Sequence, residues 1–310
     1  MVLFITGICP RNCDYCPLSN KRKNIDKIYA NEKECKNFKD IEKEVLESGA
    51  TGCGVTGGDP LAKFDRTIKI LSQLKKRFGK NFHIHIYVST LLVTEEKIKI
   101  LSKVVDEIRF HPDLEKNIEE EIKKISIAEK YFDKKSIGIE IPIFPDKKKE
   151  TINFLKKAIS HISFLNLNEL EIGESNINWI NKNYSLNEDT YTINNSLEAG
   201  KEIIKKFEKQ IRIHLCTAKT KNWYQFRNRL KNYSEKKFFK KTSDGTQIYF
   251  STKEEKIKKI LTKENYYFDE AKKQYAINPN KVREILGKIK IFKIEEYPTS
   301  DRDIVETEEL

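Results

Sequence analysis

Long apolar runs are absent from this 310-residue sequence, and methionine and tryptophan are rare, with 1 and 2 residues. No apolar stretch approaches the roughly 18–20 residues that a membrane-spanning helix needs, so we expect no membrane span. The mean hydropathy of −0.64 and a charged share of 34% are typical of a soluble protein. A strand-like apolar run begins at Val2 and leaves no room ahead of it for a signal peptide, so we expect a cytoplasmic location.

Cysteine is also scarce, and its distribution argues against a disulfide scaffold. The sequence has 6 cysteines, and three of them fall within the segment CPRNCDYC, which runs from Cys9 to Cys16. The other three, Cys35, Cys53 and Cys216, are scattered singly. This usage is typical of a reduced, cytosolic metal protein without an auxiliary cluster.

The clustered cysteines have the spacing Cys-x3-Cys-x2-Cys and follow a short apolar run and Gly7. Three thiolates on one loop suit a soft metal centre. A structural zinc site or an ordinary [4Fe–4S] cluster takes four protein ligands, and the sequence offers no local fourth cysteine or paired histidines. A [4Fe–4S] cluster held by three cysteines leaves one iron open for a substrate or cofactor. A structural zinc knuckle is the alternative.

The motif and its position after the first strand resemble those of the radical S-adenosylmethionine (radical SAM) superfamily. The resemblance includes the aromatic residue expected before the third cysteine, which is Tyr15. It implies that Cys9, Cys13 and Cys16 bind three irons of a [4Fe–4S] cluster. It also implies that the fourth iron chelates the amino and carboxylate groups of SAM, and that Tyr15 belongs to the cofactor site.

A second loop, Thr56-Gly57-Gly58-Asp59-Pro60, follows the next predicted strand, 52–56. Paired glycines let a backbone come close to a ligand. In the radical SAM family the matching Gly-Gly-Glu-Pro loop holds the amino group of SAM, which implies a cofactor-binding role for Gly57, Gly58 and Asp59. The chain departs from the family pattern at Asp59, which has a shorter side chain than the usual glutamate.

Three further residues near predicted strand ends are candidates for cofactor binding. Ser89 stands where the family often places a polar contact to SAM, although it could simply turn the chain. Arg109 suits the SAM carboxylate or a substrate anion, and a salt bridge at the barrel edge is the alternative. Glu140 lies between apolar neighbours on a predicted buried strand, so its charge needs a partner such as the SAM ribose or a buried arginine.

The last predicted barrel strand, 211–216, ends at Cys216. A thiol at this rim could donate a hydrogen atom in catalysis, and a small buried apolar residue is the alternative. Glu169 and Glu171 fall on one face near the end of the preceding strand, where they would contact substrate or lie on the rim.

Strand-like and helix-like segments alternate from residue 2 to residue 216. This alternation predicts an α/β fold with a parallel sheet, closed or part-closed as a barrel. The resemblance implies a partial (β/α)6, TIM-like barrel over residues 1–216. The stretch 173–195 is predicted to be a long loop. Residues 217–310 mix a basic helix, short aromatic strands and an acidic tail, which predicts a C-terminal α+β accessory domain.

The accessory domain contains a strongly basic segment. Residues 221–260 carry a net charge of +8 out of +12 for the whole chain, with Trp223 and Phe226 among the interleaved aromatics. Basic groups neutralise phosphates and aromatic rings stack on bases, so this segment suggests RNA binding. A domain with core aromatics and solvated lysines is the alternative.

We therefore predict a radical SAM enzyme that reductively cleaves SAM to a 5′-deoxyadenosyl radical, with RNA, specifically tRNA, as the favoured substrate. The resemblance implies a ferredoxin- or flavodoxin-type electron donor. The main enzymatic alternative is an activase for a glycyl-radical enzyme, because a compact barrel without an auxiliary cluster also resembles the pyruvate formate-lyase activating enzymes. A non-catalytic iron–sulfur protein that binds nucleic acid is the third alternative.

Overall fold

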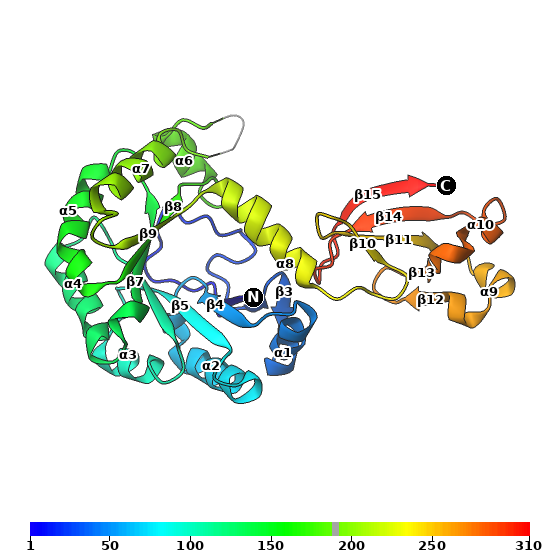
Figure 1. Ribbon diagram of the computed structural model, residues 1–310, viewed down its shortest axis with the longest axis horizontal. Coiled ribbons are helices and arrows are strands. Elements are labelled where there is room, and N and C mark those ends of the chain that lie inside the picture. Colours follow the sequence, from blue (N-terminus) through cyan, green and yellow to red (C-terminus); the bar gives the residue numbers. More distant parts are fainter. Residues whose placement is uncertain (188–191) are drawn as a thin grey trace. The chain divides into compact units, whose positions relative to one another are not determined.

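The computed structural model describes residues 1–187 and 192–310, and the chain divides into two compact units (Figure 1). The first unit comprises Met1–Val45 and Ala50–Trp223, and the second comprises Leu46–Gly49 and Tyr224–Leu310. The predicted domain limits, 1–216 and 217–310, remain a proposal. None of the helices in the described ranges is long and apolar enough to cross a membrane.

The first unit is built on a mostly parallel sheet. In the described residues its strands follow the order β3-β2-β1-β4-β5-β6-β7-β8-β9. Strands β1 and β4 to β9 are parallel, whereas β2 and β3 add an antiparallel hairpin at one edge. The strands are β1 Val2–Phe4, β2 Ile28–Ala30, β3 Lys33–Cys35, β4 Gly52–Thr56, β5 His83–Ser89, β6 Glu107–His111, β7 Ile137–Ile143, β8 Phe164–Glu169 and β9 Arg212–Cys216.

The two faces of this sheet differ in polarity. In β5, Ile84, Ile86 and Val88 are buried in the core, and His83 and Tyr87 alternate with them on the other face. Strand β6 repeats the pattern with Ile108 and Phe110 in the core. One face of the sheet is therefore apolar, and the opposite, inner face carries polar and charged side chains.

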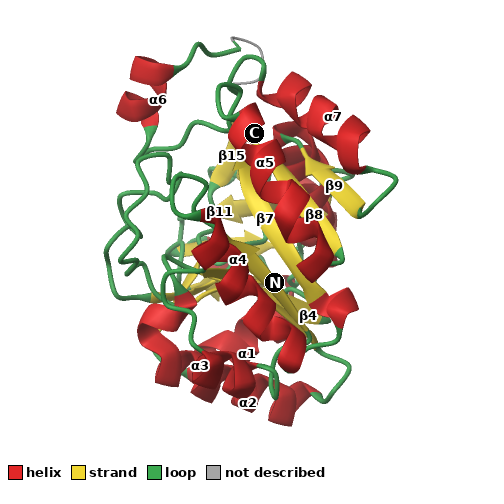
Figure 2. Cartoon of the chain, turned by 90° about the vertical axis from the view of Figure 1, so that its left-hand side faces the viewer, coloured by secondary structure: helices red, strands yellow, loops and turns green. Residues whose placement is uncertain are grey.

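Amphipathic helices contribute the other half of the apolar core. Helix α2 buries Ile70, Leu71 and Leu74 and is followed by Gly79, whose φ of +83° favours glycine. Figure 1 shows the helices in an arc outside the strands of this unit, and Figure 2 shows α7 beside β8 and β9. The helices are α1 Phe38–Glu47, α2 Phe64–Phe78, α3 Glu95–Leu101, α4 Ile118–Ser126, α5 Lys148–Ala158, α6 Ile177–Asn183 and α7 Ser196–Phe207.

The α/β class and the mostly parallel sheet confirm the coarse prediction from the sequence. A closed barrel is not observed, since no pairing joins β3 and β9 in the described part of the chain, and the partial barrel remains a proposal. The predicted loop 173–195 contains α6 and takes part in two isolated β-bridges, Glu171 with Thr192 and Leu186 with Ile193. Residues 188–191 of that loop lie outside the described residues.

The second unit is an antiparallel sheet with short helices. In its described residues the strand order is β12-β13-β11-β14-β15, with β10 paired to β11. Its buried Arg302 donates to Asp269 and Glu296, so this cation is compensated inside the unit. The elements are α8 Arg227–Asn232, β10 Lys240–Lys241, β11 Gln247–Thr252, α9 Ile257–Ile260, β12 Tyr266–Asp269, β13 Gln274–Ile277, α10 Val282–Ile285, β14 Phe292–Glu296 and β15 Ile304–Glu309.

The core between helices and sheet predicts that truncating two leucines of the first unit changes the free energy of unfolding by very different amounts. Leu101 in α3 is fully buried, whereas Leu91 is 48% exposed. Leu101→Ala should lower the free energy of unfolding by about 2–5 kcal/mol, because it leaves a cavity. Leu91→Ala should change it by no more than about 0.5 kcal/mol. Urea unfolding followed by far-UV circular dichroism measures both, and equal losses would contradict this packing.

Candidate active site at the cysteine loop

The three clustered cysteines lie on the long loop between β1 and β2, and all three are half-buried free thiols. The backbone N–H of Cys16 donates to the carbonyl of Cys13 at 3.2 Å. Burial raises the pKa of the Cys9 and Cys16 thiols. A cluster whose irons each take one thiolate suits this donor set better than a single zinc ion.

Side chains within the cysteine loop attach it to the carboxyl end of β6. Arg11 donates to the carbonyl of His111 at 2.6 Å and to that of Pro112 at 2.9 Å. The hydroxyl of Tyr15 lies 3.0 Å from Nε2 of His111, and its ring packs edge-on against Phe144. Burial is the largest cause of the raised pKa of Tyr15. The predicted Tyr15 thus orients the loop, and Arg11 and His111 are anchors that the sequence did not reveal.

The segment before α6 holds the other side of the cysteine loop. Ser175 donates to the carbonyl of Cys16 at 2.7 Å, and Asn176 donates to the carbonyl of Tyr15 at 2.9 Å. Asn176 is fully buried. Nothing in the sequence near these residues indicates this contact, because the partners are about 160 positions apart.

The predicted glycine loop lies against the beginning of the cysteine loop. The N–H of Gly58 donates to the carbonyl of Thr6 at 2.7 Å, and the N–H of Asp59 donates to the carbonyl of Ile8 at 2.9 Å. A Cβ at Gly57 would lie 2.5 Å from the oxygen of Thr6, and one at Gly58 would lie 2.5 Å from the oxygen of Ile8. The glycines therefore allow two backbones to approach closely.

Asp59 and Ser89 contact each other within the protein. The carboxylate of Asp59 is fully buried and accepts hydrogen bonds from the hydroxyl of Ser89 and from the N–H of Leu61 at 2.8 Å. Burial raises the pKa of Asp59. These contacts fix the glycine loop to the end of β5, and the direct contact of either side chain with SAM stays a prediction.

Arg109 and Glu140 form an ion pair on the inner face of the sheet. Arg109 donates to Glu140 at 3.1 Å, to Glu107 at 2.6 Å and to the hydroxyl of Tyr87 at 2.9 Å. Glu140 also accepts from the amides of Asn166 and Asn168, at 2.9 and 3.1 Å. The arginine partner that we considered for Glu140 is thus present, and binding of SAM by this pair stays a prediction.

The carboxyl end of β8 uses its acidic residues in contacts within the protein. Glu169 accepts from the N–H of Ala218 at 2.9 Å, and Glu171 pairs with Lys221 at 2.6 Å. Cys216 ends β9 and is 7% exposed, with Asn168 of β8 as its partner in the strand register. The two glutamates thus have partners within the protein. Their contact with substrate and the catalytic role of Cys216 stay predictions.

A cavity of about 260 Å³ adjoins the cysteine loop. It lies where β6 and β7 end, which is the side of a parallel sheet where ligands bind. Its lining residues are Arg11, Asn12, Cys13, Asp14, Tyr15, His111, Pro112, Asp113, Leu114, Glu115, Ile141, Pro142, Phe144, Lys147 and Trp179. A ligand in this cavity would lie beside Cys13.

A loop of three thiols beside a cavity at the carboxyl edge of a parallel sheet is typical of an iron–sulfur enzyme. The family model described as "Radical SAM superfamily" matches residues 3–125, which include the cysteine loop and the glycine loop. A relative from Methanocaldococcus jannaschii, described as a "putative glycyl-radical enzyme activating enzyme", is 36% identical over 330 aligned positions, covering 97% of this chain and 87% of the relative.

The chain belongs to the radical SAM superfamily, among its members related to pyruvate formate-lyase activating enzymes. It is an enzyme, and its cofactors are a [4Fe–4S] cluster and SAM. The non-catalytic alternative is therefore wrong.

The contact between the two loops predicts that Gly58 is needed for cluster assembly. An added methyl group at Gly58 would meet the carbonyl oxygens of Ile8 and Gly7 at 2.5 and 2.6 Å. Gly58→Ala should displace the cysteine loop at a cost of about 1–3 kcal/mol, and should lower iron and sulfide content after anaerobic reconstitution. Gly79→Ala is the control for strain at a glycine outside the two loops: its φ of +83° strains an added methyl, but no atom lies within 4 Å of that methyl, so iron and sulfide content should stay that of the wild type. Unchanged iron content in Gly58→Ala would contradict the prediction.

Proposed function

We propose that this protein activates a glycyl-radical enzyme by acting on a glycine of that partner's backbone. The observation that carries the proposal is the 36% identity with the Methanocaldococcus jannaschii relative across 97% of the chain. A match of this extent includes both units of the chain. A macromolecular substrate also suits this site, because the cavity beside the cysteine loop lies at the edge of the sheet.

Cys9, Cys13 and Cys16 are proposed to hold the cluster through three irons. The donor set supports this, since it offers three half-buried thiols on a loop that is anchored on both sides. When bound, the cluster and SAM supply a reductive cleavage that yields a 5′-deoxyadenosyl radical able to take a hydrogen atom from the substrate. A ferredoxin- or flavodoxin-type protein is proposed as the electron donor.

The surrounding residues are proposed to bind and orient the cofactor and to exclude water. The glycine loop packs against residues 6–8 at the start of the cysteine loop because Gly57 and Gly58 carry no side chain. Arg109 and Glu140 form a compensated polar network on the inner face of the proposed partial barrel, suited to the polar groups of SAM. The cavity beside Cys13 would admit an extended backbone segment with a glycine at its tip.

RNA as the substrate has no support in the comparisons, and the contacts of segment 221–260 weaken the argument for it. Arg227 pairs with Asp244 at 2.9 Å, so part of the positive charge is compensated. Phe239 stacks on Tyr249 in a buried cluster, with ring centroids 4.1 Å apart. These residues serve the fold of the second unit, and the activase alternative replaces RNA as the favoured reading.

The experiment uses the anaerobic protein with its cluster, SAM, a reductant and a candidate glycyl-radical enzyme. The expected result is a glycyl-radical signal in the partner by electron paramagnetic resonance, with 5′-deoxyadenosine formed in proportion. Cys13→Ala should abolish both, because the cluster loses a thiolate ligand. Cys35→Ala, at a buried cysteine outside the loop, should retain both.

Two outcomes would count against the proposed function. The first is formation of 5′-deoxyadenosine without a radical in any partner that carries a glycyl-radical motif. The second is modification of tRNA by the same preparation, which would favour the RNA alternative instead.

We also propose that Cys216 takes part in the reaction by exchanging a hydrogen atom. Its position at the carboxyl end of β9 supports this. Cys216→Ser should preserve SAM cleavage but lower the yield of glycyl radical about tenfold, which corresponds to roughly 1.4 kcal/mol of transition-state stabilisation. Cys53→Ser, at a cysteine that is 3% exposed in β4, is the control for a buried hydroxyl. An equal yield from the two variants would make Cys216 structural.

A further inference from the structure

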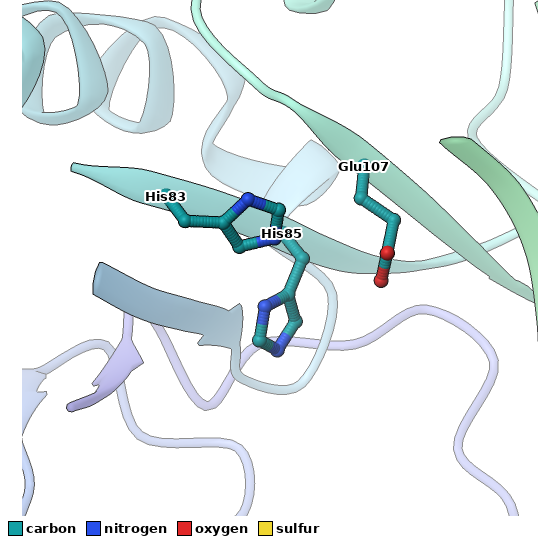
Figure 3. Close-up of side chains that lie close together, drawn as sticks. All are labelled: His83, His85 and Glu107. Carbon is teal, nitrogen blue, oxygen red and sulfur yellow. The ribbon is translucent and has the colours of Figure 1, made fainter. Parts of the chain in front are cut away.

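Two histidines and a glutamate gather at the amino ends of β5 and β6, away from the cysteine loop. His83 and His85 lie on the same inner face of β5, because side chains alternate along a strand. Glu107 is the direct partner of His85 in the strand register. One ligand atom from each residue lies within 4.8 Å of the others, and Figure 3 shows the three side chains close together.

We propose that His83, His85 and Glu107 form a binding site for a divalent transition metal ion, separate from the [4Fe–4S] cluster. Two imidazoles and one carboxylate are the donor set of many zinc and non-haem iron sites, with positions left open for water. Imidazole favours zinc, iron, nickel or copper, whereas magnesium and calcium prefer oxygen ligands alone. The ion expected at this site is therefore a divalent transition metal of borderline softness.

Neighbouring groups orient the proposed ligands. The hydroxyl of Tyr87 lies 3.2 Å from Nε2 of His85, and a carboxylate oxygen of Asp106 lies 4.0 Å from Nδ1 of His83. With these contacts kept, the metal would take Nδ1 of His85 and Nε2 of His83. Such outer partners fix the ring orientation at metal sites. Arg109 donates to Oε1 of Glu107, so Oε2 is the oxygen offered to the metal.

The backbone of β4 beside the proposed metal ligands leaves room for the His85 ring. A Cβ at Gly54 of β4 would lie 2.6 Å from Nε2 of His85, so a larger residue there would displace the imidazole. Asp106 is itself held by the N–H of Ile84 at 2.7 Å and by Lys75 at 2.6 Å. The positions of His85 and Asp106 are thus fixed by the protein before any metal binds.

Metal binding requires only a small closure of the ligands. Ligand atoms around a tetrahedral zinc ion lie about 3.3 Å apart, given zinc–ligand bonds of about 2.0–2.1 Å. The ligand atoms here all lie within 4.8 Å of one another. The side chain of His83 is 54% exposed, so a small shift of its ring towards His85 and Glu107 can shorten these separations while Asp106 stays beside Nδ1.

The proposed site is distinct from the cluster site along the same strands. Glu107 begins β6, and His111, which contacts Tyr15, ends it. The strand rises about 3.3 Å per residue, so these two ends are about 13 Å apart. A bound metal would join β5 to β6 at the end of the sheet opposite the reaction.

The test is a zinc titration of the full-length anaerobic protein with its cluster in place. We expect one zinc per chain beyond the cluster, with nitrogen and oxygen ligands and two imidazoles in the X-ray absorption spectrum at the zinc edge. His83→Ala should weaken zinc affinity about tenfold or more, since even loss of an outer partner costs 10–100-fold at metal sites. His83 is exposed, so this variant should fold.

His161→Ala is the matched control, because His161 also lies beside a carboxylate, that of Glu129 at 2.9 Å, but belongs to no three-residue metal-ligand group in the described part of the chain. It should bind zinc as the wild type does. A variant with Cys9, Cys13 and Cys16 changed to serine should also keep the zinc, which separates this proposal from the proposed function. Sulfur ligands in the spectrum, or unchanged affinity in His83→Ala, would overturn the proposal.

Discussion

The close approach of two backbone segments, at residues 6–8 and 57–58, is the constraint on which the site depends. Carbonyl groups of the first segment accept N–H donors of the second, and a Cβ at Gly57 or Gly58 would lie 2.5 Å from a carbonyl oxygen. The cysteine loop is thereby placed at the carboxyl end of β4. Arg11 then ties the same loop to the end of β6, so its thiols have a defined position before any cofactor binds.

The inner and outer faces of the sheet differ in the interactions that stabilise their side chains. The outer face is apolar and is covered by helices, which makes it the core of the unit. The inner face carries charges that need partners, and Arg109 compensates both Glu107 and Glu140. Burial and the charge of Arg109 also lower the pKa of His85 to about 3, so this imidazole is neutral at physiological pH. The inner face is therefore a polar surface whose charges are paired within the protein.

The second unit shows why composition alone is weak evidence for a ligand. Its basic and aromatic residues suggested RNA, yet several of them have roles in folding. Tyr249 is fully buried and stacks on Phe239, and Arg227 is paired with Asp244. Aromatic rings that stack on bases in one protein, and cations that neutralise phosphates there, stabilise a small sheet in another.

The sequence by itself determined the features that are local in the chain. The cysteine spacing, the Gly57-Gly58 loop and the alternation of strands and helices are each set within short segments, and they were enough to predict the superfamily and the parallel sheet. Only the tertiary structure decided the pairs that join distant segments, such as Arg11 with His111, which are 100 positions apart. Side-chain alternation could have placed His83 and His85 together, but Glu107 joins them through strand register, which no short segment encodes.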